Sequence, residues 1–389
     1  KRSRIVKKPY WLKKKYLMYR FNGLFFSSIS RVKETKEKKK MKEKKNLLVQ
    51  IDGMGDCFIR LGLLNLMEQK YGKDKIVLLT GRGQGIDMFR YLGYECIDYN
   101  QDYLSLIETK KLYKELNKYN FGDLHLMNFY NPYDVELFKH LNFETVYSYE
   151  NREKEIWWSH KETEDNFNMR YKNKKISFWK NIKKVEFVSM KGNKIIDIVY
   201  SYAKKIKKNA TKEEIEPKLK AVNTVEKEYI SICLGAGAVE KVIAPIKLIE
   251  MLKEIIKENP KVKFHVVGKG DAQEKYLEAI LKELPKDNFI NLIGKLSLLE
   301  SIKVIAESKF YIGFDSGLYN IAYTLGKKII LIVTDKYDTL FFHESENIKK
   351  VMLKENDIIN DDDIDKLYKN KYLNSIPVEN FTEAYRSLS

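Results

Sequence analysis

Asp52-Gly-Met-Gly-Asp56 follows the apolar run Leu47-Leu-Val-Gln-Ile51, and Asp315-Ser-Gly-Leu-Tyr-Asn-Ile-Ala322 follows Phe310-Tyr-Ile-Gly-Phe314 in the second half of the chain. Each stretch is typical of a strand that runs into a glycine turn, with an acidic residue where a helix begins. In open α/β sheets, ligands bind at this edge. Two such edges, far apart in the sequence, predict two α/β domains that face one central cleft.

Hydrophobic periodicity outward from these stretches predicts strands that alternate with helices, and therefore parallel sheets covered on both faces. Strands are expected at 46–51, 76–80, 94–98, 122–126, 145–149, 229–233, 262–267, 289–293, 310–313 and 329–333. Helices are expected at 57–71, 84–92, 101–119, 133–141, 195–206, 245–258, 271–284, 298–307, 316–325 and 378–388. Residues 151–208 are polar and mixed, and we expect helices there that end with the one at 195–206.

This pattern divides the chain of 389 residues into five parts. We expect a basic aromatic extension at 1–45, an N-terminal Rossmann-like domain at 46–208 and a linker at 209–228. A C-terminal Rossmann-like domain is expected at 229–375, followed by a terminal helix within 376–389 that could cross back onto the first domain.

The net charge of +18 is concentrated in the extension. Residues 1–45 contain 18 Lys/Arg and three acidic residues, whereas the rest of the chain contains 54 Lys/Arg and 51 Asp/Glu. The folded body is therefore close to neutral, which argues against a nucleic-acid track across it. Aromatic residues interleaved with Lys and Arg in the extension favour a membrane-surface anchor, and a helix packed on the body with a solvated linker stays open beside it.

The cysteines and the apolar segments bear on the compartment. Cys57, Cys96 and Cys233 are odd in number, widely spaced and fit no zinc or disulfide pattern, which favours a reducing cytosol. No stretch approaches the roughly 20 apolar residues that span a bilayer. The extension lacks the uninterrupted apolar region and the cleavage site of a secretory signal.

Glycine residues in the turns after the predicted strands allow the backbone to approach a phosphate closely, although turns in α/β proteins favour glycine in any case. None of the testable turns completes Gly-x-Gly-x-x-Gly, because Phe58, Glu240 and Gln273 occupy the third glycine position. A nicotinamide dehydrogenase is therefore disfavoured.

Two interpretations stay open for each polar residue in these turns. Asp56 is either the N-cap of the following helix or a general base, and Asp52 could tie down its own turn. Ser316 or Asp315 could cap the following helix. Alternatively, Ser316 binds a diphosphate and Asp315 accepts hydrogen bonds from sugar hydroxyls. Lys241 either neutralises a phosphate or is simply solvated.

The order and spacing of five motifs resemble glycosyltransferase family 9, the bacterial heptosyltransferases. The motifs are Met54-Gly-Asp56, Leu234-Gly-Ala-Gly-Ala-Val-Glu-Lys241, Val266-Val-Gly268, Gly294-Lys-Leu-Ser-Leu298 and Asp315-Ser-Gly-Leu-Tyr-Asn-Ile-Ala322. The resemblance covers most of 46–340. It departs at Asn320, where the family usually has His, and after Lys241, where a tryptophan common in the family is absent.

The resemblance implies the two-domain GT-B fold, with 46–208 as the acceptor domain and 229–375 as the nucleotide-sugar donor domain. It also implies an inverting, metal-independent transfer of a heptose or related sugar from a nucleoside diphosphate sugar. It implies Asp56 as the catalytic base, with Asp52, Gly53, Met54 and Gly55 in the loop on the acceptor side. The implied donor-binding residues are Lys241, Gly237, Gly268, Leu298, Asp315, Ser316, Gly317, Leu318 and Asn320.

No cofactor and no metal are expected, and ADP-heptose is the first donor to consider. The implied acceptor is a lipopolysaccharide core or a similar glycolipid or oligosaccharide. The enzyme would be cytoplasmic and peripheral on the inner membrane, with residues 1–45 at the membrane surface. The acidic run Asp361-Asp-Asp-Ile-Asp365 is better explained as the first turn of a helix than as a metal site.

Two other classes of function remain as alternatives. One is a GT-B-like protein that binds a nucleotide sugar with weak or no catalysis, which the Asn320 departure suggests. The other is a nucleic-acid-binding protein that acts through the basic extension, although nucleic acid is not the expected partner.

Overall fold

The computed structural model describes residues 43–51, 53–99, 106–127, 141–149, 182–188, 195–220, 224–333, 345–353, 368 and 371–389. Residues 1–42, Asp52 and 361–367 lie outside these ranges, so the predictions for the basic extension, for Asp52 and for the acidic run are not addressed by the structure. The described chain forms two compact units. The first unit contains the described residues up to Gly53, from Leu63 to Val188 and Asp197–Ile215, and the second contains Met54–Gly62, Ile195–Ile196 and Glu216–Ser389.

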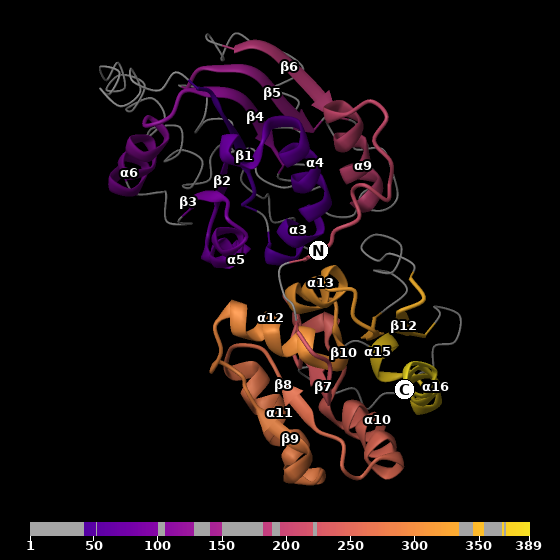
Figure 1. The fold of residues 1–389 in the computed structure, drawn as a ribbon. Helices are drawn as coiled ribbons and strands as arrows, with labels where there is room; N and C mark the ends of the chain where they lie inside the picture. Colours follow the sequence, from indigo (N-terminus) through magenta and orange to yellow (C-terminus); the bar gives the residue numbers. More distant parts are fainter. Residues whose placement is uncertain are drawn as a thin grey trace, which may run out of the picture. The chain divides into compact units, whose positions relative to one another are not determined.

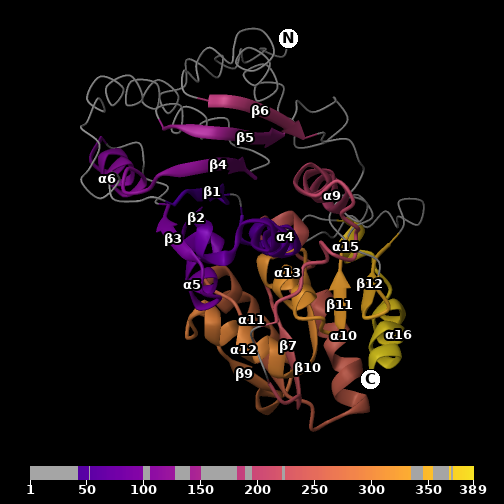
Figure 2. The ribbon, with the colours of Figure 1, turned by 45° about the horizontal axis from the view of Figure 1, so that its top comes forward.

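The first unit is built on a six-stranded parallel sheet with the strand order β3-β2-β1-β4-β5-β6. Its strands are β1 (Lys45–Val49), β2 (Ile76–Thr80), β3 (Glu95–Asp98), β4 (Phe121–Leu126), β5 (Phe143–Tyr149) and β6 (Ile182–Val188). Figure 2 shows β4, β5 and β6 side by side at one side of this sheet. Leu47, Leu48 and Val49 are all fully buried, as expected for a central parallel strand covered on both faces.

The helical elements of the first unit are α4 (Leu61–Tyr71), η2 (Lys73–Lys75), η3 (Arg82–Gln84), α5 (Ile86–Tyr91), α6 (Leu106–Leu116) and α9 (Ile195–Ile206). Leu112 and Leu116 of α6 pack in one core with residues of β1, β2 and β4. Gly81 permits a tight turn after β2, because a Cβ there would collide with the carbonyl oxygen of Tyr99.

A buried polar cluster joins the sheet of the first unit to α4 and α9. His125 of β4 lies 3.0 Å from the Tyr71 hydroxyl through Nε2 and 3.3 Å from the Tyr202 hydroxyl through Nδ1. Tyr71 also donates to Asp123 at 2.9 Å. Burial, followed by the nearby Lys70 charge, lowers the pKa of His125 to about 3, so the imidazole is neutral at ordinary pH.

The second unit contains another six-stranded parallel sheet, with the order β12-β11-β10-β7-β8-β9. Its strands are β7 (Lys227–Ile232), β8 (Phe264–Val266), β9 (Phe289–Asn291), β10 (Ser308–Phe314), β11 (Ile329–Ile332) and β12 (Ile348–Val351). Counted along the chain, both sheets have the Rossmann order 3-2-1-4-5-6. Two parallel-sheet α/β domains are therefore confirmed (Figure 1).

The helical elements of the second unit are α3 (Met54–Ile59), η6 (Val239–Lys241), α10 (Pro245–Glu258), α11 (Asp271–Glu283), η7 (Lys286–Asn288), α12 (Leu298–Glu307), α13 (Gly317–Thr324), α15 (Lys371–Asn374) and α16 (Val378–Leu388). Helices α10, α11 and α16 share one apolar core with the sheet. Helices α12 and α13 also contact the sheet, through β10. Pro245 at the first position of α10 and a Ser297–Glu300 capping box on α12 explain why these helices begin where the sequence predicts.

Several sequence predictions differ from the structure. Only helices were expected within 151–208, but Ile182–Val188 is a strand, and Ile348–Val351 forms a further strand that the sequence did not suggest. The predicted helix 57–71 starts earlier, at Met54, and is interrupted at Arg60. Helix α16 packs within the second unit through Phe381, Ala384 and Leu388, instead of crossing to the first domain.

The segment predicted as a linker is partly packed on the second unit. Leu219 donates its backbone N–H to the Thr324 carbonyl at 2.8 Å, and Tyr323 donates a side-chain hydrogen bond to Glu216. β7 already begins at Lys227, inside the predicted linker.

Within the described ranges, no helix has both the length and the apolar character required to cross a membrane. The same part of the chain holds no group of three or more His, Cys, Asp or Glu side chains arranged to bind a metal ion.

Candidate active site

The loops that carry two of the predicted motifs leave adjacent strands of the second sheet. Strands β7 and β10 are neighbours, and the chain order reverses between them, which makes this edge the topological switch point. Open α/β sheets bind ligands outside the carboxyl ends of their strands at such a point. The predicted donor-binding loops, 234–241 and 315–318, both lie there.

The loop after β7 brings Lys241 to Asp315. The Lys241 Nζ lies 2.5 Å from the Asp315 Oδ2, and the two side chains are only 21% and 10% exposed. The sequence assigned these residues separate roles, a phosphate ligand and a sugar ligand, and did not predict their ion pair. A Cβ at Gly237, in the same loop, would have no atom within 4 Å, so this part of the loop is open to an approaching ligand.

The loop after β10 ends in a capped helix. The Ser316 hydroxyl accepts a hydrogen bond from the Tyr319 N–H at 3.2 Å and is the N-cap of α13. The capping role expected for Ser316 is thus present, while phosphate binding stays a prediction. Gly317 and Leu318 are the first two helical residues, whose N–H groups have no partner within an α-helix and can bind an anion.

Helix α3 carries Asp56 and packs against α13 within the second unit. A Cβ at Gly317 would lie 2.6 Å from the Met54 Cε, and one at Gly55 would collide with the Asn320 side-chain amide. The two glycines therefore allow the close approach of the two helices. The Met54-Gly-Asp56 motif and the Asp315-Ser-Gly motif, 260 residues apart, meet at this contact.

The position of Asp56 in α3 argues against the N-cap interpretation. The helix begins at Met54, so Asp56 is its third residue and is half-buried in the first turn. Gly53, the residue before the helix, is exposed. A carboxylate in the first turn still benefits from the helix dipole, but it is not the capping residue.

Asn320 replaces the family's usual His and has two contacts in the structure. Its side-chain amide donates to the Ser316 carbonyl oxygen at 3.3 Å and lies over Gly55. The predicted donor-binding residue therefore also contributes to the contact of α13 with α3.

Gly268 and Leu298 follow the next strands of the same sheet. Gly268 has a φ of +153°, and its carbonyl accepts the N–H of Gly294 at 2.9 Å. Leu298 is the half-buried first residue of α12. Both lie at the carboxyl edge of the sheet.

The sequence analysis missed Gln273 as a site residue. Its side chain fills the space over two glycines, because a Cβ at Gly235 would lie 2.5 Å from the Gln273 Nε2 and one at Gly268 would collide with Oε1. The signal was available, since Gln273 stands where the third glycine of a dinucleotide fingerprint would be.

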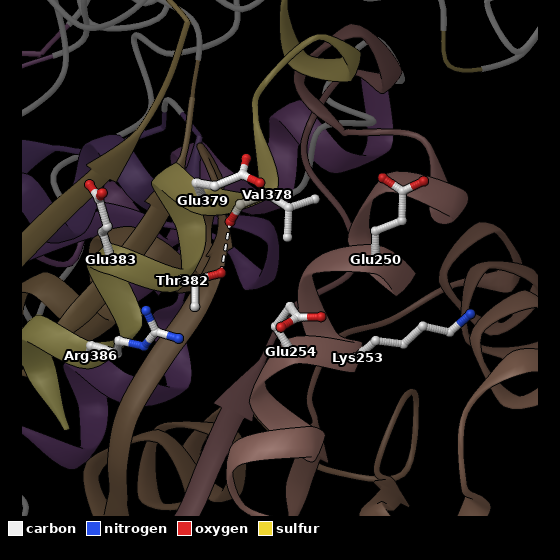
Figure 3. Close-up of a pocket in the computed structure, with 8 residues that line it drawn as sticks. All are labelled: Glu250, Lys253, Glu254, Val378, Glu379, Thr382, Glu383 and Arg386. Carbon is white, nitrogen blue, oxygen red and sulfur yellow. Dashed lines mark hydrogen bonds between the residues drawn. The ribbon is translucent and has the colours of Figure 1, made fainter.

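A groove of about 530 Å³ lies elsewhere in the second unit, between α10 and α16 (Figure 3). Its lining includes four glutamates and two cations: Glu250, Glu254, Glu379, Glu383, Lys253 and Arg386. None of the predicted site residues lines it.

Comparisons with known proteins agree with this architecture. Residues 193–365 match the family model described as glycosyltransferase family 9 (heptosyltransferase). A search of curated proteins gave no match. This match over residues 193–365 confirms the family resemblance and, with it, the prediction of a glycosyltransferase.

Solved structures support the GT-B fold over nearly the whole chain. The E. coli ADP-heptose lps heptosyltransferase II is 16% identical with a TM-score of 0.63, and the alignment covers 88% of this chain and 98% of that one. The E. coli heptosyltransferase WaaC, solved with ADP-2-deoxy-2-fluoro heptose, is 11% identical with a TM-score of 0.63, covering 89% and 100%. A glycosyl transferase family 9 protein from Veillonella parvula is 13% identical with a TM-score of 0.59, covering 89% and 97%. At these identities, the likeness establishes the fold.

Proposed function

We propose that this protein transfers a sugar, a heptose or a relative of it, from a nucleoside diphosphate sugar to an acceptor hydroxyl. The observation that carries the proposal is the meeting of three features within the second unit. They are the Lys241–Asp315 pair, the Ser316-capped start of α13, and the packing of the Asp56 helix on α13.

In the proposed reaction, Asp56 takes the proton of the acceptor hydroxyl, whose oxygen attacks the anomeric carbon in line. The bond from that carbon to the diphosphate oxygen breaks, and the nucleoside diphosphate leaves from the opposite face, which inverts the configuration. Negative charge grows on the leaving oxygen. It is met by the Lys241 ammonium, the Ser316 hydroxyl and the free N–H groups at the start of α13.

Asp315 has a second task in this proposal. Its carboxylate orients the Lys241 ammonium, and its remaining lone pairs can accept hydrogen bonds from hydroxyl groups of the donor. Gly237 allows the backbone to approach the donor closely, Gly268 lies beside the donor under the Gln273 side chain, and Leu298 supplies an apolar surface.

The donor is tested by a thermal-shift screen with ADP-, UDP-, GDP- and CMP-linked sugars, because a ligand that binds only the native state raises its melting temperature. We expect ADP-heptose to give the largest shift, since the two E. coli structural relatives are named for ADP-heptose or were solved with an analogue of it. We also expect EDTA to change neither the shift nor turnover, because no proposed step uses a metal. A chelator-sensitive activity would contradict the metal-free mechanism.

A second candidate function is nucleotide-sugar binding with little or no transfer. Asn320 favours it, because an amide cannot carry the proton or charge that a His could. Release of nucleoside diphosphate that depends on an added lipopolysaccharide-core oligosaccharide separates the two functions.

We further propose that the acceptor is a lipopolysaccharide core or a similar cell-surface glycan, reached at the cytoplasmic face of the inner membrane. The support is the net +15 charge of residues 1–45, since each Lys or Arg contributes about 1 kcal/mol near an anionic surface. A protein lacking 1–45 should no longer sediment with anionic vesicles but should still bind the donor. Continued sedimentation of the truncated protein would exclude the extension as the anchor.

A further inference from the structure

Tyr311 of β10 is a buried tyrosine whose hydroxyl the proposed mechanism does not use. The residue is 0% exposed, and its hydroxyl has no hydrogen-bond partner among the described residues. A phenylalanine would fill the same space without burying a polar group. The hydroxyl is therefore a feature that packing alone does not explain.

The Tyr311 hydroxyl reaches the carboxyl end of its strand at the switch point. Tyr311 and Gly313 are two residues apart and lie on the same face of β10. A Cβ at Gly313 would lie 2.6 Å from the Tyr311 hydroxyl, so the glycine provides the space through which the phenol passes. Cys233, at the end of the neighbouring β7, donates its N–H to Ile312 across the same pair of strands at 3.0 Å.

The Cys233 and Ser316 side chains interact with this hydroxyl, although neither does so with the geometry of an ordinary hydrogen bond. Burial raises the pKa of both Tyr311 and Cys233 above their ordinary values. Both groups therefore keep their protons, and Tyr311 is available as a hydrogen-bond donor.

Ser316 is the matching acceptor. A serine hydroxyl has two lone pairs and one proton. One lone pair accepts the Tyr319 N–H at 3.2 Å in the capping bond. If a second group donates a hydrogen bond to the other lone pair, the Ser316 hydroxyl proton must point away from both donors, toward the outside of the loop.

We propose that Tyr311 is a positioning residue for the nucleoside diphosphate. In the bound state, its hydroxyl donates to the Ser316 oxygen, and this directs the Ser316 proton at a phosphate oxygen. The inference rests on the proposed function, because it assigns the diphosphate to the turn after β10. It adds a buried support behind the Ser316 hydroxyl.

A double-mutant cycle tests this coupling. The dissociation constants of ADP, UDP, GDP and CDP are measured by calorimetry for the full-length protein, Tyr311→Phe, Ser316→Ala and the double variant. We expect Tyr311→Phe to weaken the best-bound nucleotide about tenfold, the effect of one hydrogen bond. In the Ser316→Ala background, the same substitution should have no further effect.

Stability separates positioning from a structural role. Because the Tyr311 hydroxyl makes no hydrogen bond of ordinary geometry within the described residues, Tyr311→Phe should melt at or above the temperature of the unmodified protein. Tyr202→Phe is the matched control, since its buried hydroxyl donates to the Tyr147 carbonyl in the first unit. The control should melt lower and bind the nucleotide unchanged.

Three outcomes would overturn the inference. Equal affinity of Tyr311→Phe and the unmodified protein would leave the hydroxyl without a role in binding. An equal loss in the presence and absence of Ser316 would show that Tyr311 acts by another route. If the unmodified protein binds none of the four nucleotides, the proposed function fails first, and this inference fails with it.

Discussion

Replacing Asp56 by asparagine is expected to lower kcat by about 10²–10⁴-fold, the usual contribution of a general base. Asparagine has nearly the same shape and still accepts hydrogen bonds, but it cannot take a proton from the acceptor hydroxyl. The donor is bound by other residues, so its dissociation constant should not change. The measurement is kcat with saturating donor and acceptor, together with the donor Kd from calorimetry.

The first turn of α11 offers a matched control. Asp271 is, like Asp56, an acidic residue in the first turn of a helix in the second unit. Asp271→Asn loses only the favourable interaction with the helix dipole, about 0.3–1 kcal/mol, and should keep full turnover. If Asp56→Asn behaves like Asp271→Asn, the carboxylate of Asp56 serves the helix and a different base must be sought.

The elements that the sequence predicted well are those whose signals are local. The bounds of α10, α12 and α16 agree with prediction because the apolar period of each helix coincides with a proline or a capping serine at or near its start. β6 was missed because its sequence, Ile-Lys-Lys-Val-Glu-Phe-Val, contains three charged residues, as suits an edge strand exposed to solvent. β12 is also an edge strand and has two lysines among four residues.

The same difference between local and long-range signals applies to the candidate site. The motif loops at the ends of β7 and β10 could be predicted, because a strand, a glycine turn and a helix start are consecutive in sequence. The Lys241–Asp315 pair and the packing of Asn320 on Gly55 could not, since each joins residues more than 70 positions apart. Such contacts depend on which strands become neighbours, and no local pattern specifies that.

The Lys241–Asp315 pair leads to a second prediction with a large effect. Lys241→Met is expected to lower kcat/KM by about 10²–10³-fold, the cost of removing one group that stabilises charge in a transition state. It should also destabilise the protein, because Asp315 is 10% exposed and would keep a charge without its partner. Breaking a buried ion pair costs about 3–5 kcal/mol, and we expect the lower end because the Lys241 side chain is 21% exposed.

A second substitution separates these two effects. In Lys241→Met/Asp315→Asn, no uncompensated charge remains, so the urea midpoint should return toward that of the unmodified protein while turnover stays low. Arg386→Met is the control, because its ion pair with Glu258 at 2.5 Å lies in the same unit, with the two side chains 62% and 31% exposed. Loss of that pair should change the urea midpoint little and leave turnover intact. If the double variant regains activity together with stability, Lys241 acts only as the structural partner of Asp315, and the charge on the leaving diphosphate must be stabilised by the start of α13 alone.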